Sequence, residues 1–151
     1  MTEVLTKDIS MNIQHRFLDY ANAFEITYED NDWSRLEPYF TTGAIYDSGL
    51  GETAHGRAAV MTKLEGAVDG FDRLMDTRVV DFTPPIAEGD TVRTHWTARY
   101  SKAGVPDLQF GGTEYARFEG DRIAHLRDEL DPGTEEALGN WLAQHGESLT
   151  A

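Results

Sequence analysis

In three long stretches of this 151-residue chain, more apolar and more polar residues alternate with a period of two. They span residues 91–101, 108–119 and 122–130, and a fourth strand-like stretch at 73–82 ends before Pro84-Pro85. Period-two alternation is typical of strands that bury one face. Because the turn sequences AEGD, KAGVPD and EGD separate the stretches, the second half is predicted to be a meander of antiparallel strands.

The beginning of the chain is predicted to be helical. Apolar residues recur there at the spacing of one helix face, at Ile13, Phe17, Tyr20, Ala21, Phe24 and Tyr28. Ser10 is the expected N-cap of this helix. We therefore expect residues 1–10 to form a tail and residues 11–151 to form a single domain.

Four further elements complete the expected order. Asp32 is expected to begin a short second helix, a strand to span 44–48, and a third helix to span 57–69. Asp131-Pro132 is expected to begin a C-terminal helix with Pro at its first position. Helices at one end and strands at the other predict an α+β fold, with helices on one face of a curved antiparallel sheet.

Charge and composition limit the classes of partner. The net charge is −14, from 13 basic and 27 acidic residues, which argues against binding of nucleic acids or anionic membranes. The chain has no Cys, and none of its five His forms an H-x-H or H-x-x-x-H pair, so we expect no metal and no other cofactor. No signal peptide or membrane span is apparent, so we expect a cytoplasmic protein.

The alternation also predicts which side chains face the helices. The more apolar faces carry Val92, Thr94, Trp96, Ala98 and Tyr100, then Phe110, Gly112, Glu114, Ala116 and Phe118, and finally Ala124, Leu126, Asp128 and Leu130. Two of these faces thus include a carboxylate, and Asp47 and Asp76 are candidates to join the pair. Burial and like charge both raise a carboxyl pKa, as a general acid or base requires. The alternative is that each carboxylate lies at a solvated strand end.

The residues at these positions resemble a known superfamily. The relevant segments are DWSRLEPYF, IYDSGLGETAHGRAAV, EGDTVRTHW and GGTEYARFEGDRIAHLRDELD. Over roughly residues 11–131 the chain resembles nuclear transport factor 2-like proteins, which include ketosteroid isomerases, SnoaL-type polyketide cyclases, limonene epoxide hydrolases and scytalone dehydratases. The resemblance implies a cone-shaped barrel of strongly curved antiparallel sheet, with helices packed on its concave face.

Comparison with ketosteroid isomerases implies a first set of catalytic residues. Their base is an Asp nine residues before the Gly that opens the third helix, and Asp47 lies nine residues before Gly56. Their second acid, which is protonated and donates to the oxyanion, falls on Glu114. Their oxyanion-binding Tyr falls near Phe24, and Tyr20 and Tyr28 lie one turn to either side.

Comparison with limonene epoxide hydrolases implies a different set. The segment LRDELD puts Asp128 in the place of the water-activating base, and the water-holding positions fall on Tyr46 and Ser48. The Arg-x-Asp relay of that family falls on Trp96 and Ala98, which carry no charge, and this argues against epoxide hydrolysis.

The two comparisons require opposite faces of strand 44–48. The first turns Asp47 inward, and the second turns Tyr46 and Ser48 inward. Because of the spacing to Gly56 and the apolar residues before it, we expect Asp47 to point into the pocket near Glu114.

Two hypotheses of function follow. In the first, the chain is a cofactor-free isomerase, cyclase or dehydratase that moves a proton on a small apolar carbonyl compound. Its candidate catalytic residues are Asp47, Glu114 and Asp128, and its expected pocket residues are Tyr20, Phe24, Tyr28, Tyr46, His55, Asp76, Trp96 and Tyr100. In the second, the chain is a non-catalytic module that only binds a ligand or assembles with partners. Two carboxyl or phenol groups that converge on one ligand atom would favour the enzyme.

The outer face of the sheet predicts a homodimer. That face combines Arg and Tyr, which are enriched in interfaces, with His and Thr: Arg93, His95, Thr97, Arg99, Tyr115, Arg117, His125, Arg127 and Glu129. Light scattering at micromolar concentration should give the mass of a dimer, and a monomer mass would contradict this expectation.

Overall fold

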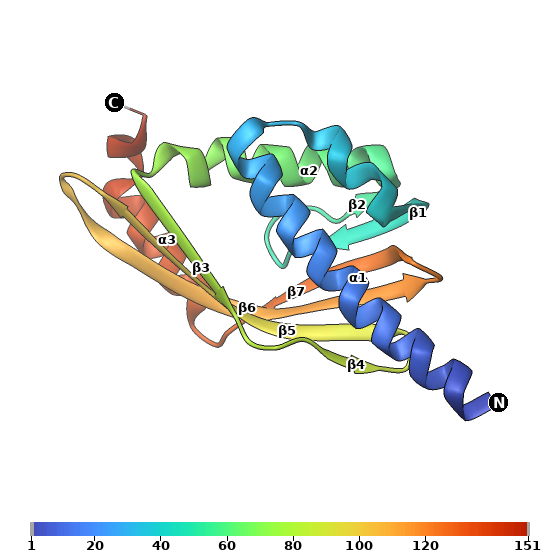
Figure 1. The fold of residues 1–151 in the computed structure, drawn as a ribbon. Helices are drawn as coiled ribbons and strands as arrows, with labels where there is room; N and C mark the ends of the chain where they lie inside the picture. The colour runs from blue at the N-terminus through green and yellow to red at the C-terminus, as the bar shows by residue number, and fades with distance from the viewer. Residues whose placement is uncertain (1, 151) are drawn as a thin grey trace.

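The protein is an α+β structure in which helices cover one face of a bent sheet (Figure 1). The computed structural model describes the backbone of residues 2–150 and the side chains of residues 13–150. The helices are α1 (Thr2–Asp30), α2 (Arg57–Gly70) and α3 (Thr134–His145), with short 3-10 helices η1 (Trp33–Tyr39), η2 (Asp72–Leu74) and η3 (Gly146–Leu149). The strands are β1 (Phe40–Asp47), β2 (Ala54–His55), β3 (Thr77–Phe82), β4 (Ile86–Glu88), β5 (Thr91–Lys102), β6 (Val105–Glu119) and β7 (Arg122–Leu130).

One sheet contains all of these strands. Its order is β2-β1-β7-β6-β5-β3, with β4 paired to β5 beside the end of β3. The strands β5, β6 and β7 form the expected antiparallel meander, whereas β1 runs parallel to β7. The fold class expected from the sequence is confirmed, with this one parallel pair as a difference.

The main core lies between the first helices and the sheet. Phe17 of α1, Leu36 of η1 and Phe40 of β1 are at most 1% exposed, and they pack in one cluster with Val60 of α2 and Leu126 of β7. Burial of such side chains from several elements stabilises the fold by roughly 1.5–3 kcal/mol each. Within residues 2–150, no helix is both long and apolar enough to cross a membrane.

Helix boundaries differ from the prediction at two places. The first helix begins at Thr2 and continues through Ser10, so the expected N-cap at Ser10 is wrong. Residues 2–9 contain no Gly or Pro that would end a helix. At the other end of the chain, the Thr134 amide donates to the Asp131 carbonyl oxygen and Gly133 is left-handed. Residues 131–134 thus form a turn, and α3 begins at Thr134 rather than at Pro132.

Two strands also differ in detail. The predicted strand 73–82 begins only at Thr77, because residues 72–74 form the 3-10 helix η2. In β7, Arg117 faces His125 but Phe118 faces Ile123, so Ala124 is the extra residue of a bulge. The bulge turns Ile123 into the core, where it is fully buried, although the alternation had assigned that face to Ala124.

A pair of glycines allows close contact in the middle of the sheet. A Cβ atom on Gly111 would lie 2.6 Å from the carbonyl oxygen of Trp96, and one on Gly112 would lie 2.7 Å from that of Glu129. Both distances are to backbone atoms of neighbouring strands, which cannot move without distorting the sheet. The glycine pair therefore fixes how closely β5, β6 and β7 approach one another.

We predict that Gly112→Ala destabilises the protein by about 1–3 kcal/mol, the usual cost of overpacking. The matched control is Gly43→Ala in β1, where an added Cβ meets no atom within 4 Å. Urea denaturation followed by circular dichroism would measure both free energies of unfolding. Equal stability of the two variants would contradict the prediction.

Candidate functional site

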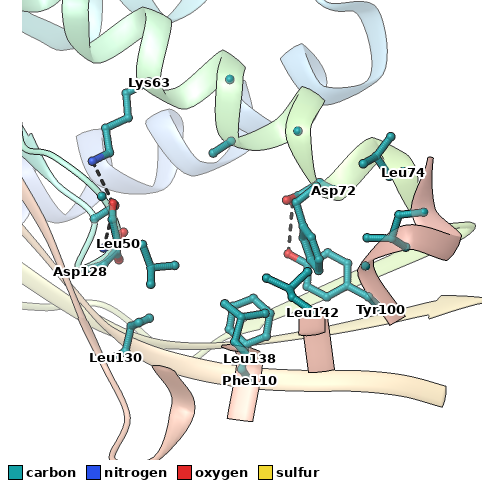
Figure 2. A pocket seen from close by; sticks show the side chains of 18 of the residues that line it. Leu50, Lys63, Asp72, Leu74, Tyr100, Phe110, Asp128, Leu130, Leu138 and Leu142 are labelled. Atoms are coloured by element: carbon teal, nitrogen blue, oxygen red, sulfur yellow. Dashed lines mark hydrogen bonds between the residues drawn. The ribbon is translucent and has the colours of Figure 1, made fainter. Parts of the chain in front are cut away.

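Two adjoining cavities open between the helices and the sheet. The outer one has a volume of about 810 Å³ and the inner one about 180 Å³. They share five lining residues, Tyr46, Asp72, Trp96, Tyr100 and Asp128. Helix α3 and η3 close the outer cavity with Leu138, Leu142 and Leu149, and Figure 2 shows Leu138, Leu142 and Phe110 between Asp128 and Asp72.

A pair of carboxyl groups lies where the cavities meet. Glu114 of β6 and Asp128 of β7 are directly opposite in the antiparallel register, so their side chains leave the same face of the sheet. The two carboxyl groups are close enough to affect each other's pKa, and they can form a hydrogen bond with each other only while one of them carries a proton. Glu114 lines the inner cavity, whereas Asp128 lines both.

Burial determines the protonation of this pair. Burial, and then the neighbouring Asp128 charge, raise the pKa of Glu114 well above its ordinary value. Burial also raises the pKa of Asp128, although the hydrogen bonds from Glu114, Tyr46 and Trp96 act in the opposite direction. Because two neutral donors, Tyr46 and Trp96, bond to Asp128, the charge of the pair is favoured on Asp128 and the proton on Glu114.

Two further donors hold the Asp128 carboxylate. The Tyr46 hydroxyl donates to Oδ2 at 3.2 Å, and the Trp96 indole N–H donates to Oδ1 at 3.1 Å. Tyr20 lines the inner cavity beside them. Burial and the two carboxyl groups raise the pKa of both Tyr20 and Tyr46 well above the ordinary value, so both phenols stay protonated and can donate.

The register of β1 explains why Tyr46 reaches this site and Asp47 does not. Tyr46 pairs with Leu126 and Asp47 with Arg127 of β7, so Tyr46 shares the inner face and Asp47 the outer one. The Asp47 carboxylate accepts a hydrogen bond from the Gly49 amide at 3.1 Å and lines neither cavity. The expected inward orientation of Asp47 is wrong, and Tyr46 and Ser48 line the outer cavity instead.

Five of the eight expected pocket residues line a cavity: Tyr20, Phe24, Tyr46, Trp96 and Tyr100. The other three lie elsewhere. Tyr28 donates to the Asp72 carbonyl oxygen at 3.5 Å, and Asp76 accepts from the Ala103 amide at 2.8 Å. His55 is exposed on the edge strand β2 and lines neither cavity.

The sequence prediction missed a second polar cluster, which is built around Arg78. The guanidinium of Arg78 donates to Glu25 at 2.7 and 3.2 Å and to Asp72 Oδ2 at 2.8 Å. Arg78 shares the inner face of β3 with Val80, and both line the inner cavity, so alternation in this strand could have revealed it. Asp72 lies in η2, where no periodicity points to it. Across the side chains of residues 13–150, no group of three His, Asp or Glu is placed to hold a metal ion.

Comparison with known proteins identifies the family. The SnoaL-like domain matches residues 19–126, so the chain belongs to the SnoaL-like family of the nuclear transport factor 2-like superfamily. A search of curated proteins found no match. The resemblance proposed from the sequence is confirmed.

Solved structures with a similar fold come from several bacteria. A candidate SnoaL-like polyketide cyclase from Jannaschia sp. CCS1 has a TM-score of 0.72 at 14% identity, covering 89% of this chain and 94% of the other. An epoxide hydrolase of the limonene epoxide hydrolase type from M. tuberculosis has a TM-score of 0.59 at 17% identity, covering 85% and 93%. A protein with a ketosteroid isomerase-like fold from Catenulispora acidiphila, in complex with trimethylamine, has a TM-score of 0.60 at 19% identity, covering 84% and 92%. At these identities the likeness establishes the fold alone.

We predict that Glu114→Gln is more stable than the wild type, and that the difference in the free energy of unfolding increases as the pH rises. Folding raises the pKa of Glu114, so the neutral form is favoured in the fold. The wild type should therefore lose stability as the pH rises above the unfolded value of about 4.3, by about 1.4 kcal/mol per unit of pKa elevation. Gln stays neutral and can still donate to Asp128, so it escapes this loss.

Thermal melts of the wild type and Glu114→Gln between pH 4.5 and pH 8 would measure the difference. The control is Glu129→Gln, which changes an exposed carboxylate on the outer face. A difference between wild type and Glu114→Gln that is the same at both pH values would contradict the prediction.

Proposed function

We propose that this protein is a cofactor-free enzyme of the isomerase, cyclase or dehydratase type that moves a proton on a small apolar carbonyl compound. The observation that carries the proposal is the Glu114–Asp128 pair, two facing carboxyl groups at the junction of the two cavities, of which burial and mutual repulsion favour one protonated and one ionised member. The Tyr46 hydroxyl converges on the same carboxylate. A base and at least one neutral donor thus lie within reach of one ligand atom, as proton transfer next to a carbonyl requires.

The roles follow from protonation and position. Asp128 is the base, because it is the ionised member and borders both cavities. It takes a proton from the carbon next to the carbonyl and becomes neutral. Its bonds from Glu114 and Tyr46 then weaken, so these donors are free to bond to the developing oxyanion. Asp128 returns the proton to another carbon in an isomerase, or to a departing hydroxyl in a dehydratase.

The cavity walls support an apolar substrate. Leu130, Leu138, Phe110 and Leu142 line the outer cavity, and its volume of about 810 Å³ fits a molecule of drug size. The family includes a candidate polyketide cyclase, whose class of substrate is compatible with such walls. Epoxide hydrolysis is disfavoured, because Trp96 and Ala98 occupy the relay positions; here Trp96 donates to Asp128.

Two expectations accompany this proposal. A homodimer through the outer sheet face would leave the cavities open, because their lining residues lie on the opposite face of β5, β6 and β7. A cytoplasmic location would suit proton transfer on a metabolite.

We predict that the wild type accelerates exchange of the protons next to the carbonyl of 4-phenylbutan-2-one with deuterium from solvent. Asp128→Asn should lower the acceleration at least a hundredfold, because general acid–base catalysis is worth about 10²–10⁴-fold. Glu129→Gln should leave it unchanged, since Glu129 is the next residue of β7 but points to the outer face. Proton NMR in deuterated buffer measures the rates.

The same experiment separates the enzyme from a binding module. Binding of the ketone without exchange above the buffer rate would support the non-catalytic alternative. Full activity of Asp128→Asn would show that another group is the base.

A further inference from the structure

A second polar site lies at the end of the cavity remote from the carboxyl pair. Figure 2 shows Asp72 and Tyr100 at one end and Asp128 at the other. Asp72 is 16% exposed and borders both cavities. The Tyr100 hydroxyl donates to Asp72 Oδ2 at 3.2 Å, the same oxygen that accepts from Arg78.

Asp72 retains capacity to bind a further donor. Both of these bonds end on Oδ2, and no side chain among residues 13–150 donates to Oδ1. Arg78 is only 9% exposed, and Glu25 already pairs with it through two bonds. Glu25 therefore balances the charge of Arg78, and Arg78 does not require Asp72 as a counter-ion.

Strand β5 sets the distance between the two polar ends. Trp96 donates to Asp128, and Tyr100 donates to Asp72. These two residues are four positions apart on the same face of β5, which is about 13 Å along an extended strand. Between them lie the apolar side chains of Phe110 and Leu138.

We propose that Asp72, oriented by Tyr100 and Arg78, binds a hydroxyl group at the far end of the substrate. The substrate class is then an elongated carbonyl compound with an apolar body and a hydroxyl at the opposite end. This inference rests on the proposed function for the carbonyl end. A hydroxyl suits the site better than an ammonium group, because an ammonium group brings three donors and the neighbouring cavity side chains of Phe71 and Leu74 offer no acceptor for the other two.

The site should also reject a molecule that lacks the hydroxyl. A ligand that fills the cavity without a donor removes water from Asp72 and leaves a buried acceptor unpaired. Sites built to bind a hydroxyl discriminate strongly against analogues without it. Asp72 therefore acts as a residue of specificity: it strengthens binding of hydroxylated ligands and weakens binding of analogues that lack the hydroxyl.

The test compares 4-(4-hydroxyphenyl)butan-2-one with 4-phenylbutan-2-one by calorimetry. The wild type should bind the hydroxylated ketone at least tenfold more tightly. Asp72→Ala should abolish that preference, because it weakens binding of the hydroxylated ketone and, by removing the unpaired acceptor, does not weaken binding of 4-phenylbutan-2-one. Asp76→Asn is the matched control, because its exposed carboxylate lies outside both cavities, and it should keep the full preference.

Asp72→Asn provides a second variant if Asp72→Ala does not fold. It keeps the shape but loses the charge that strengthens the hydrogen bond, so the preference should fall at least threefold. Equal affinity of the wild type for the two ketones, or no binding of either, would overturn the inference. An unchanged preference in a folded Asp72 variant would also overturn it.

The two proposals fail in different measurements. If Asp128→Asn retains deuterium exchange while Asp72→Ala loses the hydroxyl preference, the role of Asp128 as base is wrong and the hydroxyl site at Asp72 is supported. If exchange depends on Asp128 but the preference survives in Asp72→Ala, the hydroxyl site at Asp72 is wrong and the role of Asp128 is supported.

Discussion

The contact on which the site depends is the one between Glu114 and Asp128 across β6 and β7. Two ionised carboxylates cannot lie side by side in an apolar interior, because desolvation and repulsion both oppose it. The pair is tolerated because one proton is retained and because donors approach from other strands. Tyr46 comes from β1 and Trp96 from β5, so four strands must be in register before the carboxylate is satisfied. The chemistry proposed for the site is thus tied to correct assembly of the sheet.

That assembly depends on features that bring strands close or shift their register. The glycine pair at 111–112 lets the carbonyl groups of Trp96 and Glu129 approach β6, next to the residues that hold the carboxyl pair. The bulge at Ala124 restores the inward direction of Ile123 without changing that of Leu126 or Asp128. Parallel pairing of β1 with β7 then brings Tyr46, and not Asp47, over the pair.

Alternation in the sequence predicted the inner faces of β5 and β6, and with them Glu114, Trp96 and Tyr100, because side chains of a regular strand must alternate. The same pattern found Asp128 on β7, beyond the bulge. It could not decide between Tyr46 and Asp47, because a shift of one residue exchanges the faces and the register of β1 is set by a partner about 80 residues away. Asp72 was missed because it lies in a 3-10 helix and reaches the cavity only through the path of the chain between α2 and β3.

The buried polar groups of the cavity lower the stability of the fold, and this supports a functional role for both the Glu114–Asp128 pair and Asp72. Replacing a buried charged pair by apolar residues of similar volume is often neutral or stabilising, by 1–4 kcal/mol in some proteins. Tyr100 stacks on Phe110, with ring centroids 5.7 Å apart, and meets Phe71 edge-on at 5.0 Å. These aromatic contacts do not involve the Asp72 carboxylate. Functional sites are the places where such costs are usually retained. One strand, β5, carries a donor to each carboxylate, Trp96 to Asp128 and Tyr100 to Asp72, so the rigidity of that strand would hold the two ends of a substrate at a fixed separation.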